Sequence, residues 1–432
     1  MAELKGALEW LADYPYGCLE QTCSRIFPLI SACGILNALN SSDAVNRKEY
    51  VESGVRRVES MIRKNDFVMW PDCNYSPWDS EVSLYAAHFL IEAERSGVKP
   101  RDAARAKVMD FLSKWAMSST NSVSAYACHT LALAGRPEKD RMFRLYDVRA
   151  ELDLLSRARL ARAFVSIGDR ARAGELLKNA DSPESVKEAA FLLLALLDLD
   201  PGDGRCASLA SYLASKRDGE RFSWGTTDEN AHALLALGEY WRHNPVTPGK
   251  PDVKEDSGRL VNVGEGAAFL AWKRLDLPKP EDVADESKGL AIRREFLTAS
   301  GEPYDIANAK CGDLVMVRLS LSCDETRDLN DLVVEDLFSG AMEPVHGALD
   351  VSLYPWIPKD SHDWIMRSDA RDDRMLVFSK KFNLKKGDEV HFHYPLRVVS
   401  AGAFQLPKVA VEAMYQPGLR ARSDGGRVVS GH

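Results

Sequence analysis

The sequence lacks the features that would place the protein in several specialised classes. Its longest apolar run covers residues 189–197, far short of the roughly 20 residues that a membrane-spanning helix needs. Residues 1–10 carry scattered charges and no apolar h-region, so they do not resemble a signal peptide. The net charge of −8 and the lack of a long lysine and arginine run argue against a nucleic-acid binder. Taken alone, these absences predict a cytoplasmic protein.

Metal-binding patterns are also missing. The chain holds 8 cysteines, and their spacing fits neither a dense disulfide scaffold nor paired zinc motifs. The one adjacent aspartate pair, Asp372 and Asp373, lies in the C-terminal part of the chain, and no D-D-x-x-D-like cluster occurs in the helical part. We therefore expect no metal and no organic cofactor.

What the chain has is ordinary for a soluble multidomain protein. It has 432 residues, of which 45% are hydrophobic and 28% charged. That length suggests two or three domains, and the composition allows a sizeable core and excludes wholesale disorder.

Helical periodicity dominates from residue 18 to about residue 242. Apolar residues recur at i, i+3, i+4 and i+7 in a series of segments. Gly and Pro separate them, and Pro28 is expected to kink or end the first helix. The recurrence indicates helix pairs that bury a face by stacking, as an open solenoid or a closed ring. The predicted helices are 82–93, 103–116, 122–134, 152–167, 183–197, 205–216 and 228–241.

The pattern changes after residue 242. Residues 243–258 are polar and proline-rich, which is typical of a linker. Beyond them the period switches to two, with predicted strands at 314–321, 375–382 and 390–394. Short strands between Asp, Gly and Pro turns indicate a β-sandwich.

The most informative feature is Y-P-Y-G-C-L-E-Q at residues 14–21, which places a thiol three positions before a glutamine. If residues 18–21 open a helix, side chains at i and i+3 share a face, so the sulfur of Cys18 can reach the carboxamide carbon of Gln21. Condensation with loss of ammonia would leave an internal thioester. Such a bond is a stored electrophile that reacts once with an amine or hydroxyl.

The neighbours of this motif fit the same chemistry. Gly17 allows a tight turn before the helix. Tyr14 and Tyr16 bring flat apolar rings that would exclude water from an acyl bond. We interpret Glu20 as a first-turn carboxylate, and Cys23 as a buried helix residue in preference to a disulfide or exchange partner of Cys18.

The motif and the segments that follow it resemble one family. Y-P-Y-G-C-L-E-Q-T, running into C-S-R-I-F-P-L-I, resembles the thioester segment of bacterial alpha-2-macroglobulins. Residues 70–90 and 224–241 look like two later helical segments of that family, and residues 402–423 are similar to its C-terminal macroglobulin domain. The resemblance covers almost the whole chain.

The resemblance implies a multidomain α plus β architecture. A closed α/α toroid, the thioester domain, is expected over residues 1–246. A linker and a returning β element of the domain that hosts the toroid are expected over 247–285, with the β element beginning at residue 261. An antiparallel macroglobulin-type β-sandwich is expected over 286–432.

The resemblance also implies a function. Family members are large, exported, often lipid-anchored inhibitors, so this chain is expected to be a C-terminal piece of a periplasmic or cell-envelope protein. It would be a broad-spectrum endopeptidase inhibitor and no enzyme, because its acyl group is used once. Its partners would be target proteases, trapped through a lysine, and a peptidoglycan synthase of the penicillin-binding type in envelope defence.

The resemblance further suggests a shield over the acyl bond. In the family, residues of the last macroglobulin domain keep water from the thioester, and the A-M-Y segment at residues 413–415 is the best candidate here. We therefore assign shielding to Met414 and Tyr415, together with Tyr14 and Tyr16. Ordinary core positions in the sandwich are equally compatible with Met414 and Tyr415.

Histidines are weighed as alternatives. In animal relatives a histidine can redirect the acyl group to hydroxyls, but His88, His129 and His232 lie in apolar helical segments, which favours packed side chains. Direct aminolysis by lysine is then expected. His391 and His393 share a strand face without a third ligand nearby, which favours a solvated face over a zinc site.

Two other functions stay open on sequence grounds. One is an interaction module in which the thioester never forms. The other is an α/α-toroid enzyme of the terpenoid-cyclase or prenyltransferase type, which would need an aspartate-rich or Cys/His/Asp metal set inside the ring.

Overall fold

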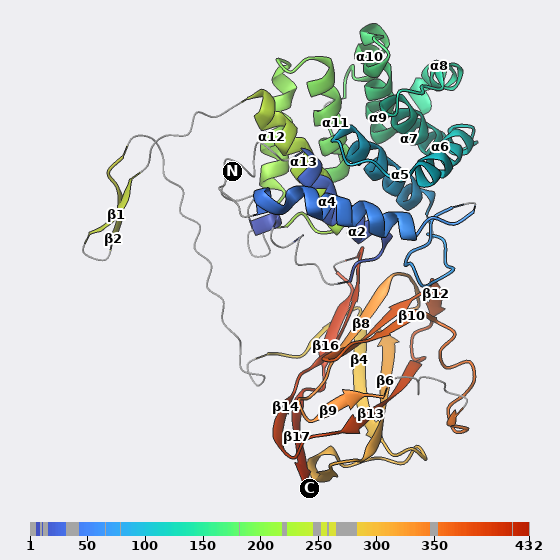
Figure 1. The fold of residues 1–432 in the computed structure, drawn as a ribbon, viewed down its shortest axis with the longest axis vertical. Coiled ribbons are helices and arrows are strands. Elements are labelled where there is room, and N and C mark those ends of the chain that lie inside the picture. Colours follow the sequence, from blue (N-terminus) through green and yellow to red (C-terminus); the bar gives the residue numbers. More distant parts are fainter. Residues whose placement is uncertain are drawn as a thin grey trace. The chain divides into compact units, whose positions relative to one another are not determined.

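A computed structural model of the chain shows two compact units, residues 1–272 and 273–432. The first contains the helices and the second is a β-structure (Figure 1). The finer division at residues 246 and 285 stays a prediction. The structure describes residues 6–8, 11, 16–31, 43–64, 66–77, 79–180, 182–217, 223–244, 252–256, 259–264, 283–345, 353–416 and 418–431.

The helices of the first unit follow one another through turns that carry Gly97, Gly135 and Gly168, each with a positive φ. Their bounds are α2 Leu19–Ser31, α4 Asp43–Ser60, α5 Ser80–Arg95, α6 Asp102–Ala116, α7 Asn121–Leu133, α8 Lys139–Asp147, α9 Leu154–Ser166, α10 Arg170–Leu176, α11 Val186–Leu199, α12 Gly204–Ser215 and α13 Thr227–His243.

Six of these helices form a closed inner ring. Helices α5, α7, α9, α11 and α13 pack one against the next, and α2 packs against both α13 and α5. Helices α4, α6, α8, α10 and α12 pack on the outside of the ring. The closure confirms the toroid and excludes the open solenoid that periodicity alone allowed. The inner helices are buried on most sides, and α11 is buried continuously over residues 189–197.

The observed helices match the predicted ones within a few residues, except where the apolar pattern is weak. Helices α4, α8 and α10 were not predicted, because they present few apolar residues to the ring. Pro28 does not end α2, which continues to Ser31.

The strands form one hairpin in the first unit and the sheets of the second. Their bounds are β1 Val253–Asp256, β2 Arg259–Asn262, β3 Glu286–Lys288, β4 Leu290–Leu297, β5 Ala309–Lys310, β6 Leu314–Cys323, β7 Arg327–Leu329, β8 Leu332–Leu337, β9 Met342–Pro344, β10 Ile365–Ala370, β11 Arg374–Ser379, β12 Phe382–Leu384, β13 Val390–Val398, β14 Gly402–Leu406, β15 Val409–Ala413, β16 Arg420–Ser423 and β17 Gly426–Gly431.

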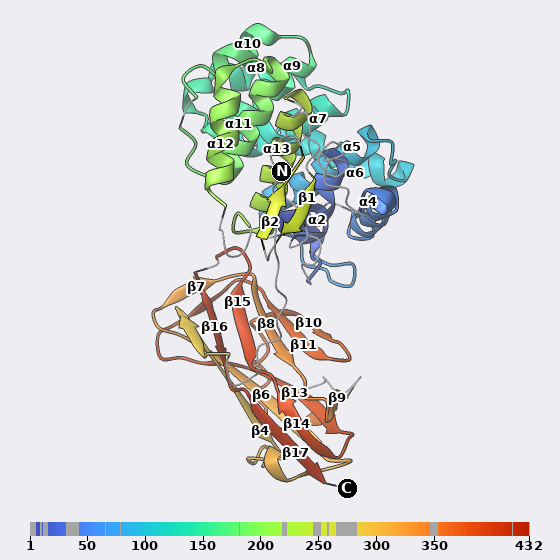
Figure 2. The same ribbon diagram turned by 90° about the vertical axis from the view of Figure 1, so that its left-hand side faces the viewer.

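Two larger sheets enclose the core of the second unit, as the predicted sandwich requires. In the described residues, one sheet has the order β10-β11-β8-β15-β16-β3 and the other β4-β6-β13-β9 (Figure 2). Their pairings are antiparallel. Val317, Tyr394, Val334 and Val377 point into one apolar core, because alternate residues of a strand face the same side.

Two strand predictions need correction. The single strand expected over residues 375–382 is two strands, since β11 pairs with β8 and β10 whereas β12 pairs with β7. The expected linker at 243–258 contains strand β1, which pairs with β2. Of the expected β element that begins at residue 261, the structure describes the end of β2, and residues 265–282 lie outside the described part.

Candidate thioester site

Cys18 and Gln21 cap the N-terminus of α2 for each other. The Cys18 carbonyl accepts the first intrahelical hydrogen bond, from the Thr22 N–H at 2.8 Å, which makes Cys18 the N-cap residue. The Gln21 N–H donates to Cys18 Sγ at 3.5 Å, and the Cys18 N–H donates to Gln21 Oε1 at 3.2 Å. This is the reciprocal geometry of a capping box, with sulfur in the place of a hydroxyl.

The capping box brings the two predicted reactants together and hides them from water. Both side chains have 0% exposure. The Cys18 sulfur accepts from the Gln21 backbone N–H and the Gln21 carboxamide oxygen accepts from the Cys18 backbone N–H, so each side chain lies against the other residue. The sequence prediction that residues 18–21 open a helix is confirmed.

The turn before α2 is held by the neighbouring helix. Gly17 has a φ of +65°, a conformation that side chains with a Cβ adopt at a cost. The Arg57 guanidinium on α4 donates from Nη2 to the Gly17 carbonyl oxygen at 2.8 Å, and the Leu19 N–H donates to the Met69 carbonyl oxygen at 2.9 Å. Neither Arg57 nor Met69 was singled out from sequence, because only tertiary packing brings them to the motif.

Of the aromatic residues predicted to shield the bond, Tyr16 is buried, and Tyr14 lies outside the described residues. In the second unit Met414 is buried and Tyr415 is half-buried. Both follow strand β15, and the Met414 N–H donates to the Asp331 carbonyl oxygen at 3.0 Å. Their shielding part stays a prediction.

Glu20 sits in the first turn of α2, as predicted, and is also deeply buried, at 3% exposure. Its carboxylate accepts a hydrogen bond from the Ser24 hydroxyl one turn further along α2. It also accepts from the Thr227 hydroxyl at 2.8 and 3.0 Å. Thr227 is the first residue of α13, and nothing in the sequence marked it as a neighbour of the motif.

Cys23 is a fully buried free thiol on α2. Burial raises the pKa of the Cys23 thiol well above its usual value, and the charges of Glu20 and Cys18 raise it further. A protonated, enclosed thiol is a poor nucleophile. The predicted packing role fits these observations.

Three histidines on inner helices of the first unit lie inside the helical ring. His88, His129 and His232 are all buried, as their apolar segments predicted. Burial lowers the pKa of His88 to about 4, where it lies 3.2 Å from the Tyr126 hydroxyl. Burial likewise holds the pKa of His129 well below its usual range.

Charged groups of the inner helices form a network beside these imidazoles. Arg159 pairs with Glu81, and Lys187 bridges Glu81 to Asp228 with nitrogen to oxygen distances of 2.7 to 2.8 Å. These cations hold the pKa of Glu81 at about 2, against the opposing effect of burial. The charges neutralise one another, and the described residues contain no group of three His, Cys, Asp or Glu side chains that could hold a metal ion.

The expectation of a solvated face for the strand histidines is wrong for His393. That side chain is 3% exposed, because Trp356 packs edge-on against it and His362 stacks beside it. His391 is half-buried and lies 3.0 Å from the Ser320 hydroxyl. Sequence could not show this, since Trp356 and His362 come from a distant loop.

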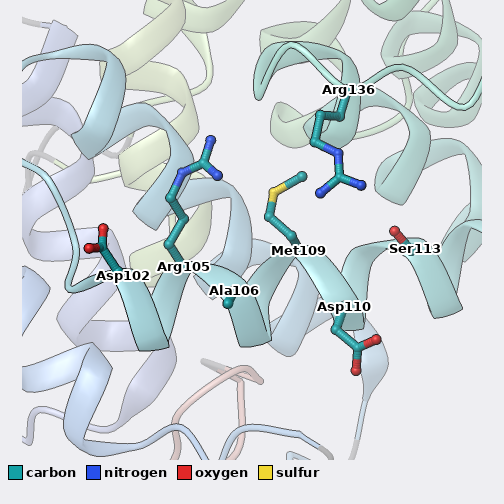
Figure 3. A pocket seen from close by; sticks show the side chains of 7 residues that line it. All are labelled: Asp102, Arg105, Ala106, Met109, Asp110, Ser113 and Arg136. Carbon is teal, nitrogen blue, oxygen red and sulfur yellow. The ribbon is translucent and has the colours of Figure 1, made fainter.

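A separate concavity of about 460 Å³ lies on the outer helix α6. In Figure 3 the Arg105 and Arg136 side chains border it on either side of Met109, and Asp110 points away. Arg105 is already paired with Glu94 at 2.8 Å. None of the predicted site residues lines this concavity.

Comparison with known proteins agrees with the fold. Residues 289–418 match the family model described as the bacterial alpha-2-macroglobulin MG10 domain. An alpha-2-macroglobulin from Xylella fastidiosa is 25% identical over 96% of this chain and 29% of its own length. The native Escherichia coli alpha-2-macroglobulin structure superposes with a TM-score of 0.80 at 20% identity, covering all of this chain and 30% of that one.

A Salmonella alpha-2-macroglobulin that had reacted with methylamine also superposes, with a TM-score of 0.77 at 22% identity over 99% of this chain and 31% of that one. The fold is thus an α/α toroid followed by a macroglobulin-type sandwich. Residues 289–418 thus match a domain of the bacterial alpha-2-macroglobulin family, and the chain as a whole is similar to bacterial alpha-2-macroglobulins. It spans about 29% of the length of the curated relative from Xylella. Among the described residues, no helix combines the length and apolarity that a membrane crossing demands.

Proposed function

We propose that this chain carries the covalent trap of a bacterial alpha-2-macroglobulin-type protease inhibitor, and that the trap is a thioester between Cys18 and Gln21. The observation that supports it is the reciprocal cap, in which the thiol and the carboxamide meet at a buried helix N-terminus. The same spacing is shared with the family motif.

Bond formation follows from this geometry. Cys18 Sγ adds to Cδ of Gln21, the negative charge collects on Oε1, and the side-chain nitrogen then leaves as ammonia with the thiol proton. The Cys18 backbone N–H already points at Oε1 from 3.2 Å, so it would stabilise that charge as an oxyanion donor. The buried surroundings would slow the competing attack of water.

Release reverses the same step with a different nucleophile. An amine attacks Cδ of Gln21, a carbon–nitrogen bond forms, and the carbon–sulfur bond breaks with the electron pair going to sulfur. The amine proton ends on sulfur and restores the Cys18 thiol. With a protease lysine as the amine, inhibitor and target are joined by an amide, and the acyl group is spent.

The biological setting belongs to the same proposal. In the parent protein, cleavage by an attacking protease would expose the acyl bond, and a periplasmic or cell-envelope location would let it meet foreign proteases. A peptidoglycan synthase partner and a lipid anchor rest on the sequence resemblance alone. The step itself requires no metal or organic cofactor.

Peptide mapping by mass spectrometry tests the proposal. Residue 21 would be found as the thioester, as a methylamide after incubation with methylamine, or as glutamate where water has already opened the bond. The methylamide must appear together with a newly free Cys18 thiol. Cys18→Ala gives the background for ordinary deamidation, and Cys23→Ala leaves the reaction intact.

The outcome separates the proposed trap from its rivals. If residue 21 remains an unmodified glutamine at the Cys18→Ala background level, the acyl bond never forms. The chain would then be an interaction module of the same fold.

A further inference from the structure

We infer that Glu20 is a positioning residue, which ties the turn carrying Cys18 and Gln21 to the N-terminus of α13 and thereby holds the two reactants in register. The inference rests on the proposed thioester and assigns the third side chain of the C-L-E-Q motif a part in making it.

Glu20 and its hydrogen-bond partners link three helices of the inner ring. Its carboxylate accepts from the Thr227 hydroxyl on α13 at 2.8 Å and from the Ser24 hydroxyl on its own helix. The Ser24 hydroxyl lies 3.2 Å from the Tyr85 hydroxyl on α5. One buried carboxylate thus connects α2 to both of the helices that flank it in the ring.

The environment favours an ionised carboxylate at this place. Glu20 lies in the first turn of α2, and Thr227 opens α13, so the positive ends of two helix dipoles converge on it. Hydroxyl donors to a carboxylate form charge-assisted hydrogen bonds, which are stronger than neutral ones. These contacts compensate for the removal of Glu20 from water.

The position of Glu20 in the motif explains why its hydrogen bonds matter for forming the thioester. Glu20 stands two residues after Cys18 and directly before Gln21, within the first turn, where a helix frays most easily because its N–H groups lack intrahelical partners. With the carboxylate fixed, the first turn of α2 keeps the backbone conformation that holds the Cys18 and Gln21 side chains close together. Without it, the cap would open more often, and small displacements of reacting atoms reduce rates strongly.

The test measures conversion of Gln21 in the full 432-residue chain. The measured quantity is the fraction of residue 21 found as thioester, glutamate or methylamide, each corrected for the Cys18→Ala background. Thr227→Val removes the hydroxyl and keeps the shape, and Thr227→Ser restores a hydroxyl. Glu20→Ala removes the carboxylate itself. Melting temperature is recorded for each variant.

A matched control comes from the neighbouring residue. Thr226 is the N-cap of α13: its hydroxyl accepts from the Glu229 backbone N–H, and its own N–H donates to the Glu229 carboxylate. Thr226→Ala therefore weakens the same helix end by a route that does not involve Glu20, and it lowers the melting temperature without lowering conversion.

We expect Thr227→Val and Glu20→Ala each to reduce the conversion of Gln21 at least severalfold. Thr227→Ser should retain the wild-type conversion. The double variant Glu20→Ala/Thr227→Val should convert no less than Glu20→Ala alone. Conversion in Thr227→Val equal to wild type overturns the inference, as does equal loss in Thr226→Ala or no rescue by Thr227→Ser. An absence of conversion in the wild type is a different result, because it removes the proposed function and the inference with it.

Discussion

Met414 is fixed to Asp331 through the backbone, since its N–H donates to the Asp331 carbonyl oxygen at 3.0 Å. Asp331 is itself unusual, with a φ of +53° and a side chain that is buried and accepts from Asn330 Nδ2 at 2.8 Å. The predicted shielding segment is therefore hydrogen-bonded to the backbone of Asp331, which carries a buried carboxyl group and directly precedes β8.

Asp331→Asn should stabilise the second unit at neutral pH. Burial raises the pKa of Asp331 to about 6, so the native state binds the proton more tightly than the unfolded state, and stability declines as the pH rises from about 4 to 6. Asparagine tolerates the positive φ and carries no charge. We expect a gain of about 3 kcal/mol near pH 7, measured by denaturant unfolding, and little change near pH 4.

The exposed Asp363 provides the control for this prediction. Asp363→Asn removes a solvated carboxylate and should leave the unfolding free energy unchanged at both pH values. A loss of stability in Asp331→Asn at neutral pH would contradict the interpretation.

Tyr415→Ala tests the shield. If the ring keeps water from the acyl bond, its removal should accelerate release of the Cys18 thiol on the order of tenfold, equivalent to about 1.4 kcal/mol of barrier. The rate is followed with a thiol reagent, and the exposed Tyr50 on α4 supplies the control variant Tyr50→Ala. Equal rates in wild type and Tyr415→Ala would remove the shielding role.

Gly17→Ala should destabilise the first unit by about 1 to 2 kcal/mol, because an L-residue at φ +65° is strained. Space is not the reason, since an added Cβ would meet the Arg57 side chain at an ordinary 3.5 Å. We expect a lower thermal midpoint and less conversion of Gln21. The control is Gly174→Ala within α10, where a Cβ meets nothing within 4 Å, and helix propensity predicts a slight gain in stability.

The first unit should lose stability in mild acid through His88. The pKa of His88 falls from an ordinary 6.5 to about 4 on folding. Below pH 6.5 the unfolded state therefore binds a proton at His88, whereas the native state does not. The free energy of unfolding thus drops as the pH falls toward 4. The loss between about pH 7 and pH 5 should reach about 2 kcal/mol. The groups that surround His88 are Tyr126, Glu92, Arg162, His129 and His232.

His88→Gln retains an acceptor for Tyr126 without titrating in this range. Its unfolding free energy should vary less with pH than that of the wild type, as measured by urea unfolding monitored by helical circular dichroism. His243→Gln, at the exposed end of α13, should keep the wild-type slope. A pH profile of the His88→Gln variant as steep as that of the wild type would place the titration elsewhere.

The sequence by itself determined the local features of the molecule. C-x-x-Q at a helix start is a capping pattern, and the hydrogen bonds that close it join residues three apart. The inner helices α5, α7, α9, α11 and α13 likewise follow from an apolar periodicity that each segment carries within itself. Helices with weak apolar faces, such as α4, were not predicted because their own segments carry little of this periodicity.

Only the tertiary structure decided which distant groups meet. Thr227 reaches Glu20 across 207 positions of the chain, Arg57 reaches Gly17, and His362 stacks on His393, because the ring closes and the sheets stack. Periodicity fixes which face of a helix or strand is buried, but not its partner. Partner choice depends on packing many elements at once, and that information is distributed over the whole chain.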